Sequence, residues 1–233
     1  MSYFEAATLG IIQGLTEYLP VSSSGHLVLA QELFGFNPKG IAFEIVVHLG
    51  SLLAVLVYFR QRLWRLFKSL YPNGERQERK YIQYLFLATI PAGIIGLAFE
   101  DFFDKMFSSP VMTSFLLFIT GLILLSTRFA PRTTGEVSLA KSLVIGLAQA
   151  SAILPGISRS GSTITAGLWA KVDPAKAAEF SFLLSIPAIG GAAILKSDEL
   201  ISQSALELAP FLISAVLSCM LYMAANPRRY SIK

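Results

Sequence analysis

Two short polar stretches interrupt an otherwise apolar chain, and their residue types suit the binding and cleavage of a phosphate group. The first, residues 13–26, holds a glutamine and a glutamate four residues apart, then three serines and a histidine. The second, residues 155–163, places one arginine among glycines and hydroxyl side chains. Arginine binds phosphate oxygens through two parallel hydrogen bonds, and glycines leave backbone N–H groups open to a ligand. The side chains of interest are Gln13, Glu17, Ser22, Ser23, Ser24, His26, Ser158, Arg159, Ser160 and Thr163, together with the backbone of Gly156.

The composition places these stretches in a membrane protein. The 233 residues are 54% hydrophobic and only 15% charged, which excludes an ordinary soluble domain. The net charge of +4 comes from basic residues that flank apolar runs, so it indicates membrane topology and excludes a nucleic-acid-binding face. One cysteine and two histidines are too few for a His/Cys metal cage, so any metal would have oxygen ligands. No cleaved signal peptide is expected at the N-terminus.

Five apolar runs are long enough to cross a bilayer as helices. The charges that flank them alternate, and the most basic loop, residues 60–80, is expected on the cytoplasmic side. Two further segments, residues 1–40 and 139–174, are broken in the middle by proline and glycine. Each is therefore expected to enter the membrane and return on the same side as a re-entrant helix pair. The five expected spans are residues 41–59, 81–99, 110–127, 177–195 and 208–225.

The two broken segments are related to each other. A shift of 136 residues (149 minus 13) superposes seven identical pairs, among them Gln13 on Gln149. Because the first copy contains an odd number of crossings, the second copy must be inverted. The predicted fold is an all-α integral membrane protein, an inverted repeat of a re-entrant helix pair plus transmembrane helices in one membrane domain. The first repeat is residues 1–136; the second, residues 137–233, is expected to lack its last helix, since two full units would need about 272 residues.

The arginine gives the sharpest prediction about chemistry. An unpaired arginine in the middle of a membrane costs about 2.5–3.5 kcal/mol, so Arg159 requires an anionic partner. A plain ion pair with Glu17 would satisfy it, and the serines would then only cap the returning helix. Helix N-termini, exposed glycine backbone and the guanidinium group together match phosphate oxygens better. The sequence therefore predicts a phosphate or diphosphate site, with the ion pair as the alternative.

The chain resembles the undecaprenyl-diphosphatase family of membrane phosphatases, the bacitracin-resistance type. Residues 13–17, QGLTE, match the family's (E/Q)xxxE motif, and residues 155–163, PGISRSGST, match its PGxSRSxxT motif. The resemblance covers nearly the whole chain, and the motifs are highly specific. It implies interlocked inverted repeats in the bacterial plasma membrane, with a site that opens to the outer face. It also implies removal of the terminal phosphate of undecaprenyl diphosphate, which recycles the lipid carrier for cell-wall synthesis and gives bacitracin resistance.

The resemblance also implies roles for individual side chains. Gln13 and Glu17 are acid/base or metal-binding groups, and Mg²⁺ or Ca²⁺ suits their oxygen ligands. Ser23 and His26 are the nucleophile and its partner, or His26 is itself the nucleophile, and the sequence does not choose between them. The implied catalytic set is Glu17, Ser23, His26 and Arg159, and the implied substrate-binding set is Gln13, Ser22, Ser24, Gly156, Ser158, Ser160 and Thr163.

Two functions fit the expected topology. One is hydrolysis of a prenyl diphosphate whose lipid tail lies between the helices. The other is a lipid-carrier flippase, because secondary transporters also use inverted repeats with broken helices. Gln13 stands where other family members carry glutamate, which weakens a metal site built from paired acids. A homo-oligomer is one way to complete the shortened second repeat, and membrane lipids are the other expected partners. Among the polar residues within apolar runs, Glu44, His48 and Glu179 are expected to be structural.

Overall fold

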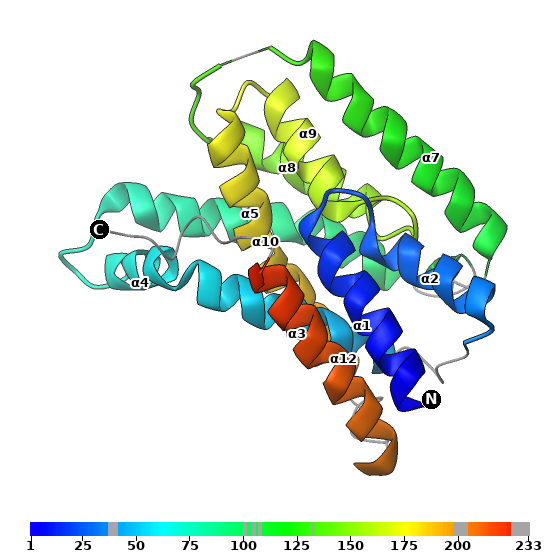
Figure 1. The fold of residues 1–233 in the computed structure, drawn as a ribbon. Coiled ribbons are helices and arrows are strands. Elements are labelled where there is room, and N and C mark those ends of the chain that lie inside the picture. The colour runs from blue at the N-terminus through cyan, green and yellow to red at the C-terminus, as the bar shows by residue number, and fades with distance from the viewer. Residues whose placement is uncertain are drawn as a thin grey trace.

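The computed structural model describes residues 1–36, 42–99, 102–103, 106, 109–131, 133–197 and 205–224. Within these ranges the regular structure is helical throughout, which confirms the expected all-α class (Figure 1). The elements are α1 (Tyr3–Tyr18), α2 (Ser23–Phe34), α3 (Ala42–Tyr58), α4 (Arg60–Ser69), α5 (Arg76–Ala98), α7 (Pro110–Ser126), the 3₁₀ turn η1 (Thr127–Phe129), α8 (Leu139–Ser151), α9 (Arg159–Trp169), α10 (Pro174–Leu195) and α12 (Ala205–Ala224).

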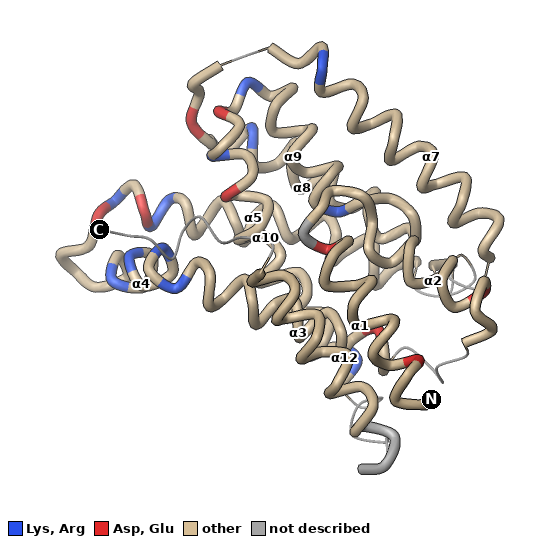
Figure 2. Tube along the Cα trace, in the orientation of Figure 1, with Lys and Arg blue, Asp and Glu red and all other residues tan. Residues whose placement is uncertain are grey.

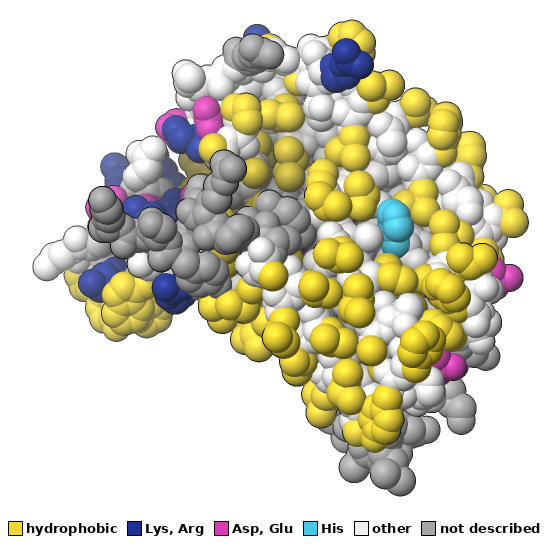
Figure 3. Space-filling model, in the orientation of Figure 1, with side chains coloured by type: hydrophobic (Ala, Val, Ile, Leu, Met, Phe, Trp, Pro, Cys, Tyr) yellow, Lys and Arg dark blue, Asp and Glu magenta, His cyan; other side chains and the backbone are white. Residues whose placement is uncertain are grey.

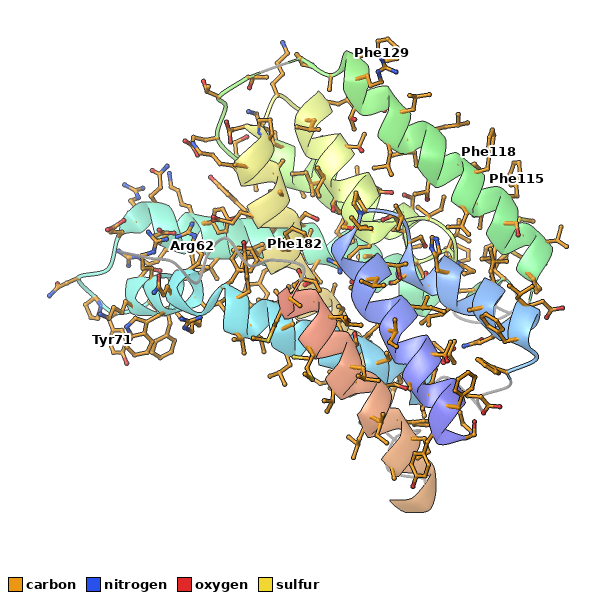
Figure 4. All side chains as sticks on the ribbon, viewed as in Figure 1. Arg62, Tyr71, Phe115, Phe118, Phe129 and Phe182 are labelled. Carbon is orange, nitrogen blue, oxygen red and sulfur yellow. The ribbon has the colours of Figure 1, made fainter. Side chains whose placement is uncertain are left out.

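Several helices have the length and apolarity of membrane spans. Helices α5 and α10, and α7 together with η1, each meet both requirements, and α3 meets them together with α4, from which it is bent by 73°. In α12, residues 209–224 form a shorter apolar helix. Phe115 and Phe118 on α7 and Phe129 on η1 point away from the other helices (Figure 4), as expected of a surface that faces lipid. These helices coincide with the five apolar runs that the sequence marks as spans.

Charged residues avoid the apolar parts of these helices. Lysine and arginine gather on α4 and the beginning of α5, whereas long stretches of the other helices carry neither sign of charge (Figure 2). This separation is the pattern expected when the helices lie in hydrocarbon and the basic end lies at the membrane surface. The chain therefore fits a multi-pass membrane protein.

Both segments that the sequence marks as broken form helix–turn–helix pairs, α1–α2 and α8–α9. The second helix of each pair begins with the same cap, because the Ser22 hydroxyl accepts a hydrogen bond from the N–H of Gly25 and the Ser158 hydroxyl accepts one from Gly161. The backbone of both turns has a positive φ, 68° at Ser22 and 101° at Gly156. Glycine adopts this conformation readily and serine does not, so the first turn stores backbone strain.

Small residues let the first helix of each pair approach a distant helix closely. Helix α1 packs on α12, and α8 packs on α5 (Figure 1). A Cβ atom on Gly10 would lie 2.6 Å from the Cα of Ser214, and one on Gly146 would lie 2.8 Å from the Cα of Ala88. Close contact between helix backbones at small residues is a main source of association in membranes. These two interfaces therefore hold the helix–turn–helix pairs in place.

Replacing Gly10 with alanine is expected to lower the apparent melting temperature of the protein in detergent. The added methyl group would overlap the Ser214 backbone, and overpacking typically costs about 1–3 kcal/mol. Gly93→Ala in α5 is the matched control, because a Cβ there meets nothing within 4 Å, and alanine favours the helix. Equal melting temperatures for the two variants would contradict tight packing of α1 on α12.

Candidate active site

The turns of the two helix–turn–helix pairs contact each other. A Cβ on Gly25 would lie 2.9 Å from the Cα of Gly156, and a Cβ on Gly161 would lie 2.8 Å from the carbonyl oxygen of Pro20. Helices α2 and α9 therefore begin side by side. The N-terminus of a helix carries partial positive charge and unpaired N–H groups, so two of them together favour a bound anion.

A threonine of α7 fixes the second turn. The Thr120 hydroxyl donates a 2.7 Å hydrogen bond to the carbonyl oxygen of Gly156 and accepts a 3.0 Å hydrogen bond from the N–H of Ser158. Thr120 is 3% exposed, so water does not compete for either contact. The backbone of Gly156 is thus engaged within the fold, and a Cβ there would lie 2.5 Å from the carbonyl oxygen of Thr113, so the glycine lets this turn pack against α7.

Arg159 forms an ion pair with Glu17, the partner that the sequence gives as the alternative to a phosphate group. Its Nη2 is 2.6 Å from Oε1 of Glu17, and its Nη1 donates a 3.4 Å hydrogen bond to the carbonyl oxygen of Ser181. The two charged side chains are only 18% and 10% exposed. Breaking a buried pair by removing one partner leaves an uncompensated charge and is strongly destabilising. The ion pair therefore joins α1 to α9 across the contact between the two turns.

The second oxygen of Glu17 accepts a hydrogen bond from a hydroxyl group. Ser23 donates a hydrogen bond to Oε2 of Glu17, and Gln13 donates a 3.3 Å hydrogen bond to the same oxygen through Nε2. Nε2 of His48 is 3.8 Å away from this oxygen. A carboxylate that already accepts the hydrogen bond of a hydroxyl is placed to take its proton when that hydroxyl reacts. One carboxylate thus contacts a potential nucleophile on one side and a guanidinium on the other.

His26 has a different neighbour from the one expected. Its Nδ1 lies 2.8 Å from the carbonyl oxygen of Ser22, so Nδ1 donates and the neutral ring keeps its lone pair on Nε2. Among the described residues, the hydrogen-bond acceptor of the Ser23 hydroxyl is Glu17, and no hydrogen bond joins Ser23 to His26. The hydroxyls of Ser22 and Ser24 are 3.3 Å apart in the same turn.

The first turn of α9 carries the remaining predicted site residues. The Ser158 hydroxyl caps the helix and lies 3.4 Å from the Ser160 hydroxyl. Thr163 donates a 2.7 Å hydrogen bond to the backbone carbonyl oxygen of Arg159, and its hydroxyl is 2.6 Å from that of Ser181 on α10. Thr163 therefore holds α9 against α10, whereas Ser158 and Ser160 lie at the point where the two turns meet.

A buried polar network behind Glu17 was not identified from the sequence. Gln13 also donates a 3.3 Å hydrogen bond to the Ser51 hydroxyl, which is 2.7 Å from the hydroxyl of Ser218 on α12. His48 lies one helical turn before Ser51 on α3, and its Nδ1 donates a 2.7 Å hydrogen bond to the backbone carbonyl oxygen of Glu44. The sequence does carry a signal for this network: His48 and Ser51 are three positions apart in an apolar run, and this spacing places both on one helix face.

The fit of a divalent cation depends on Gln13 and Glu17. Within the described ranges, no three histidine, cysteine, aspartate or glutamate side chains come together. Oε1 of Gln13 is buried and has no hydrogen-bond partner, since Nε2 makes both amide contacts. Amide and carboxylate oxygens are ligands of the kind that Mg²⁺ or Ca²⁺ takes, with phosphate and water as the others. The donor types therefore suit such a cation, while both oxygens of Glu17 already accept hydrogen bonds, Oε1 from Arg159 and Oε2 from Ser23 and Gln13.

Comparison with known proteins identifies the family of this chain. Residues 6–225 match the family model described as Bacitracin resistance protein BacA, a range that includes every predicted site residue. The chain belongs to this family. A relative from Carboxydothermus hydrogenoformans, named undecaprenyl-diphosphatase, is 44% identical over 224 residues, which cover 91% of this chain and 82% of the relative. Its namesake from Bacteroides thetaiotaomicron is 44% identical over 200 residues, covering 84% of this chain and 76% of the relative.

Proposed function

We propose that this BacA-family protein hydrolyses undecaprenyl diphosphate to undecaprenyl phosphate and inorganic phosphate in the bacterial plasma membrane. The reaction would recycle the lipid carrier for cell-wall synthesis and give bacitracin resistance. The observation that carries the proposal is the arrangement of Ser23, Glu17 and Arg159 where the two turns meet. The names of the relatives support the same activity and give the flippase alternative no support.

The geometry favours Ser23 as the nucleophile. Its Oγ would attack the terminal phosphorus and form an O–P bond while its proton passes to Oε2 of Glu17. The bond from phosphorus to the bridging oxygen would break, and the electron pair would leave with undecaprenyl phosphate. Water would then hydrolyse the phosphoserine. Arg159 and the N-terminus of α9 would neutralise the charge of the transferred group, which is the main requirement of phosphoryl transfer.

His26 remains the alternative nucleophile, through the Nε2 lone pair that its contact with the Ser22 carbonyl leaves free. Attack by His26 would give a phosphohistidine. Ser23 is preferred because its hydroxyl already has a hydrogen-bonded proton acceptor.

A divalent cation, Mg²⁺ or Ca²⁺, would be held by Glu17 and by Oε1 of Gln13. It would supply positive charge to the phosphate oxygens. The unpaired, fully buried Oε1 supports this proposal, and Gln13 then contributes a neutral ligand where a second carboxylate would contribute a charge.

We further infer that the fold is an inverted repeat, with residues 1–136 and 137–233 as its units and the site open to the outer face. Reciprocal packing supports it, since α1 of the first unit lies on α12 and α8 of the second lies on α5. The 136-residue shift aligns Gly10 with Gly146, and each of these glycines closely contacts the backbone of a helix in the other unit, at Ser214 and Ala88. Helix α7 contacts both α2 and α9 and has no counterpart among the described residues of the second unit.

Phosphate release by the purified protein tests the activity and its cation together. We expect release from undecaprenyl diphosphate, slower release from farnesyl diphosphate because its short tail gives less binding energy, loss of activity in chelator, and recovery on adding Mg²⁺ or Ca²⁺. Activity that chelator leaves unchanged would remove the cation from the proposal. An intact protein that releases no phosphate with either ion would overturn the proposed function.

A further inference from the structure

Three aromatic side chains form an exposed stack on α4 and the turn that follows it. The rings of Trp64 and Phe67 are stacked with centroids 5.7 Å apart, and Phe67 meets Tyr71 edge to face at 5.8 Å. Trp64 is 57% exposed, Phe67 49% and Tyr71 59%. Figure 4 shows the Tyr71 side chain beyond α4, pointing away from the helix bundle, and Figure 3 shows apolar side chains beside basic ones at this end.

Two basic side chains accompany the aromatic stack. Nζ of Lys68 lies 5.4 Å from the centroid of the Trp64 ring, and Arg65 is exposed next to it in sequence. In the part of the chain that the structure describes, no carboxylate pairs with Arg65 or Lys68. This face of α4 therefore combines apolar rings with positive charge that its own neighbours leave unneutralised.

The opposite face of α4 is held in the fold by Arg62. Its Nε donates a 2.7 Å hydrogen bond to Glu179 on α10, its Nη1 pairs with Glu78 on α5, and its guanidinium lies over the Tyr81 ring at 4.8 Å. Leu66, on the same side of the helix, is buried. These contacts fix the rotation of α4 about its axis, and the aromatic face therefore points away from the other helices.

We propose that this face, formed by Trp64, Arg65, Phe67, Lys68 and Tyr71, is a docking surface for acidic phospholipid headgroups. Helix α4 is bent by 73° from α3. If α3 crosses the membrane, α4 therefore runs along the membrane surface. Aromatic rings settle at the level of the headgroups, and nearby lysine and arginine attract anionic lipid. Phosphate groups of the lipid would neutralise Arg65 and Lys68, which have no carboxylate partner among the described residues. This surface lies outside the candidate active site and does not depend on the proposed hydrolysis.

Fluorescence of Trp64 in reconstituted vesicles tests the proposal. A Trp169→Phe variant leaves Trp64 as the only tryptophan. The variant is placed in vesicles of phosphatidylcholine and phosphatidylglycerol in which bromine, a quencher, is carried by one lipid or the other at equal mole fraction. We expect brominated phosphatidylglycerol to quench at least about twofold more strongly, because each basic residue near the surface favours an acidic neighbour. The preference should fall at high salt.

Removing the basic charges gives the decisive comparison. In the Trp169→Phe background, Arg65→Gln with Lys68→Gln should make quenching by the two lipids equal. Arg76→Gln with Lys80→Gln is the matched control, since it removes two exposed charges from the neighbouring helix α5 and should keep the preference. Equal quenching before any charge is removed would overturn the proposal, and so would a preference that survives the Arg65/Lys68 change. Emission typical of water, or shielding from both brominated lipids, would assign the face to solvent or to a protein partner instead.

Discussion

Replacing Arg159 with lysine is expected to lower kcat/KM for undecaprenyl diphosphate by about 10²–10³-fold, the usual effect of removing one donor that stabilises a transition state. Lysine keeps the charge that pairs with Glu17, but it cannot contact Glu17, the Ser181 carbonyl and a phosphate oxygen with one planar group. Steady-state phosphate release in detergent or vesicles measures the change. Lysine is preferred to alanine because alanine would leave the Glu17 carboxylate buried without a partner.

Arg62→Lys is the matched control for this prediction. Arg62 also lies between two oxygen-bearing partners, Glu78 and Glu179, but on α4 and outside the candidate active site. The control variant should have a lower melting temperature and an unchanged kcat/KM per folded molecule. Comparable losses of activity in the two variants would mean that the Arg159 effect reflects the stability of a buried ion pair and not phosphate binding.

The sequence predicts the helices of this protein well because each carries its own signal. The apolar runs are long, and the breaks at residues 19–22 and 152–158 coincide with proline, glycine and serine, which end or cap helices. The polar tips could be recognised as one site, because residues of opposite charge are costly in hydrocarbon unless they meet. That cost requires an anionic partner for Arg159, and the partner is Glu17, which the sequence gives as the alternative to a phosphate group.

The partner of Ser23 could not be predicted in the same way. Spacing along α2 favours His26, which is three residues away, whereas the acceptor of the Ser23 hydroxyl is Glu17 on α1. The turn between the two helices reverses the chain and brings Ser23 to Glu17. In this turn Ser22 has a positive φ, which the residue pattern does not predict. Thr120 was missed for a related reason, because its role depends on where α7 crosses the second turn. Such contacts between distant helices are tertiary, and a periodicity in the sequence carries no information about them.

The expected result of replacing Ser23 with alanine is a loss of phosphate release by at least about 10³-fold, since the nucleophile is removed and only binding and charge stabilisation remain. Glu17→Gln, measured per folded molecule because it leaves Arg159 without its carboxylate, should lose activity to a similar degree since the glutamine cannot take the Ser23 proton. Residues that act as a unit are not additive, so the double variant should be no slower than the slower single variant. Initial rates of all three variants, with the wild type, measure this.

Ser114→Ala is the control for Ser23→Ala. Among the described residues, this exposed serine on α7 hydrogen-bonds only the Pro110 carbonyl oxygen of its own helix, so its loss should leave turnover unchanged. Acid quenching of the wild type during turnover then separates the two nucleophiles. Phosphoserine survives acid and phosphohistidine does not, so an acid-stable phosphoenzyme that disappears in Ser23→Ala supports attack by Ser23. Full turnover by Ser23→Ala, together with an inactive but folded His26→Ala, would instead make His26 the nucleophile and reduce the Ser23–Glu17 hydrogen bond to a device that orients the carboxylate toward Arg159.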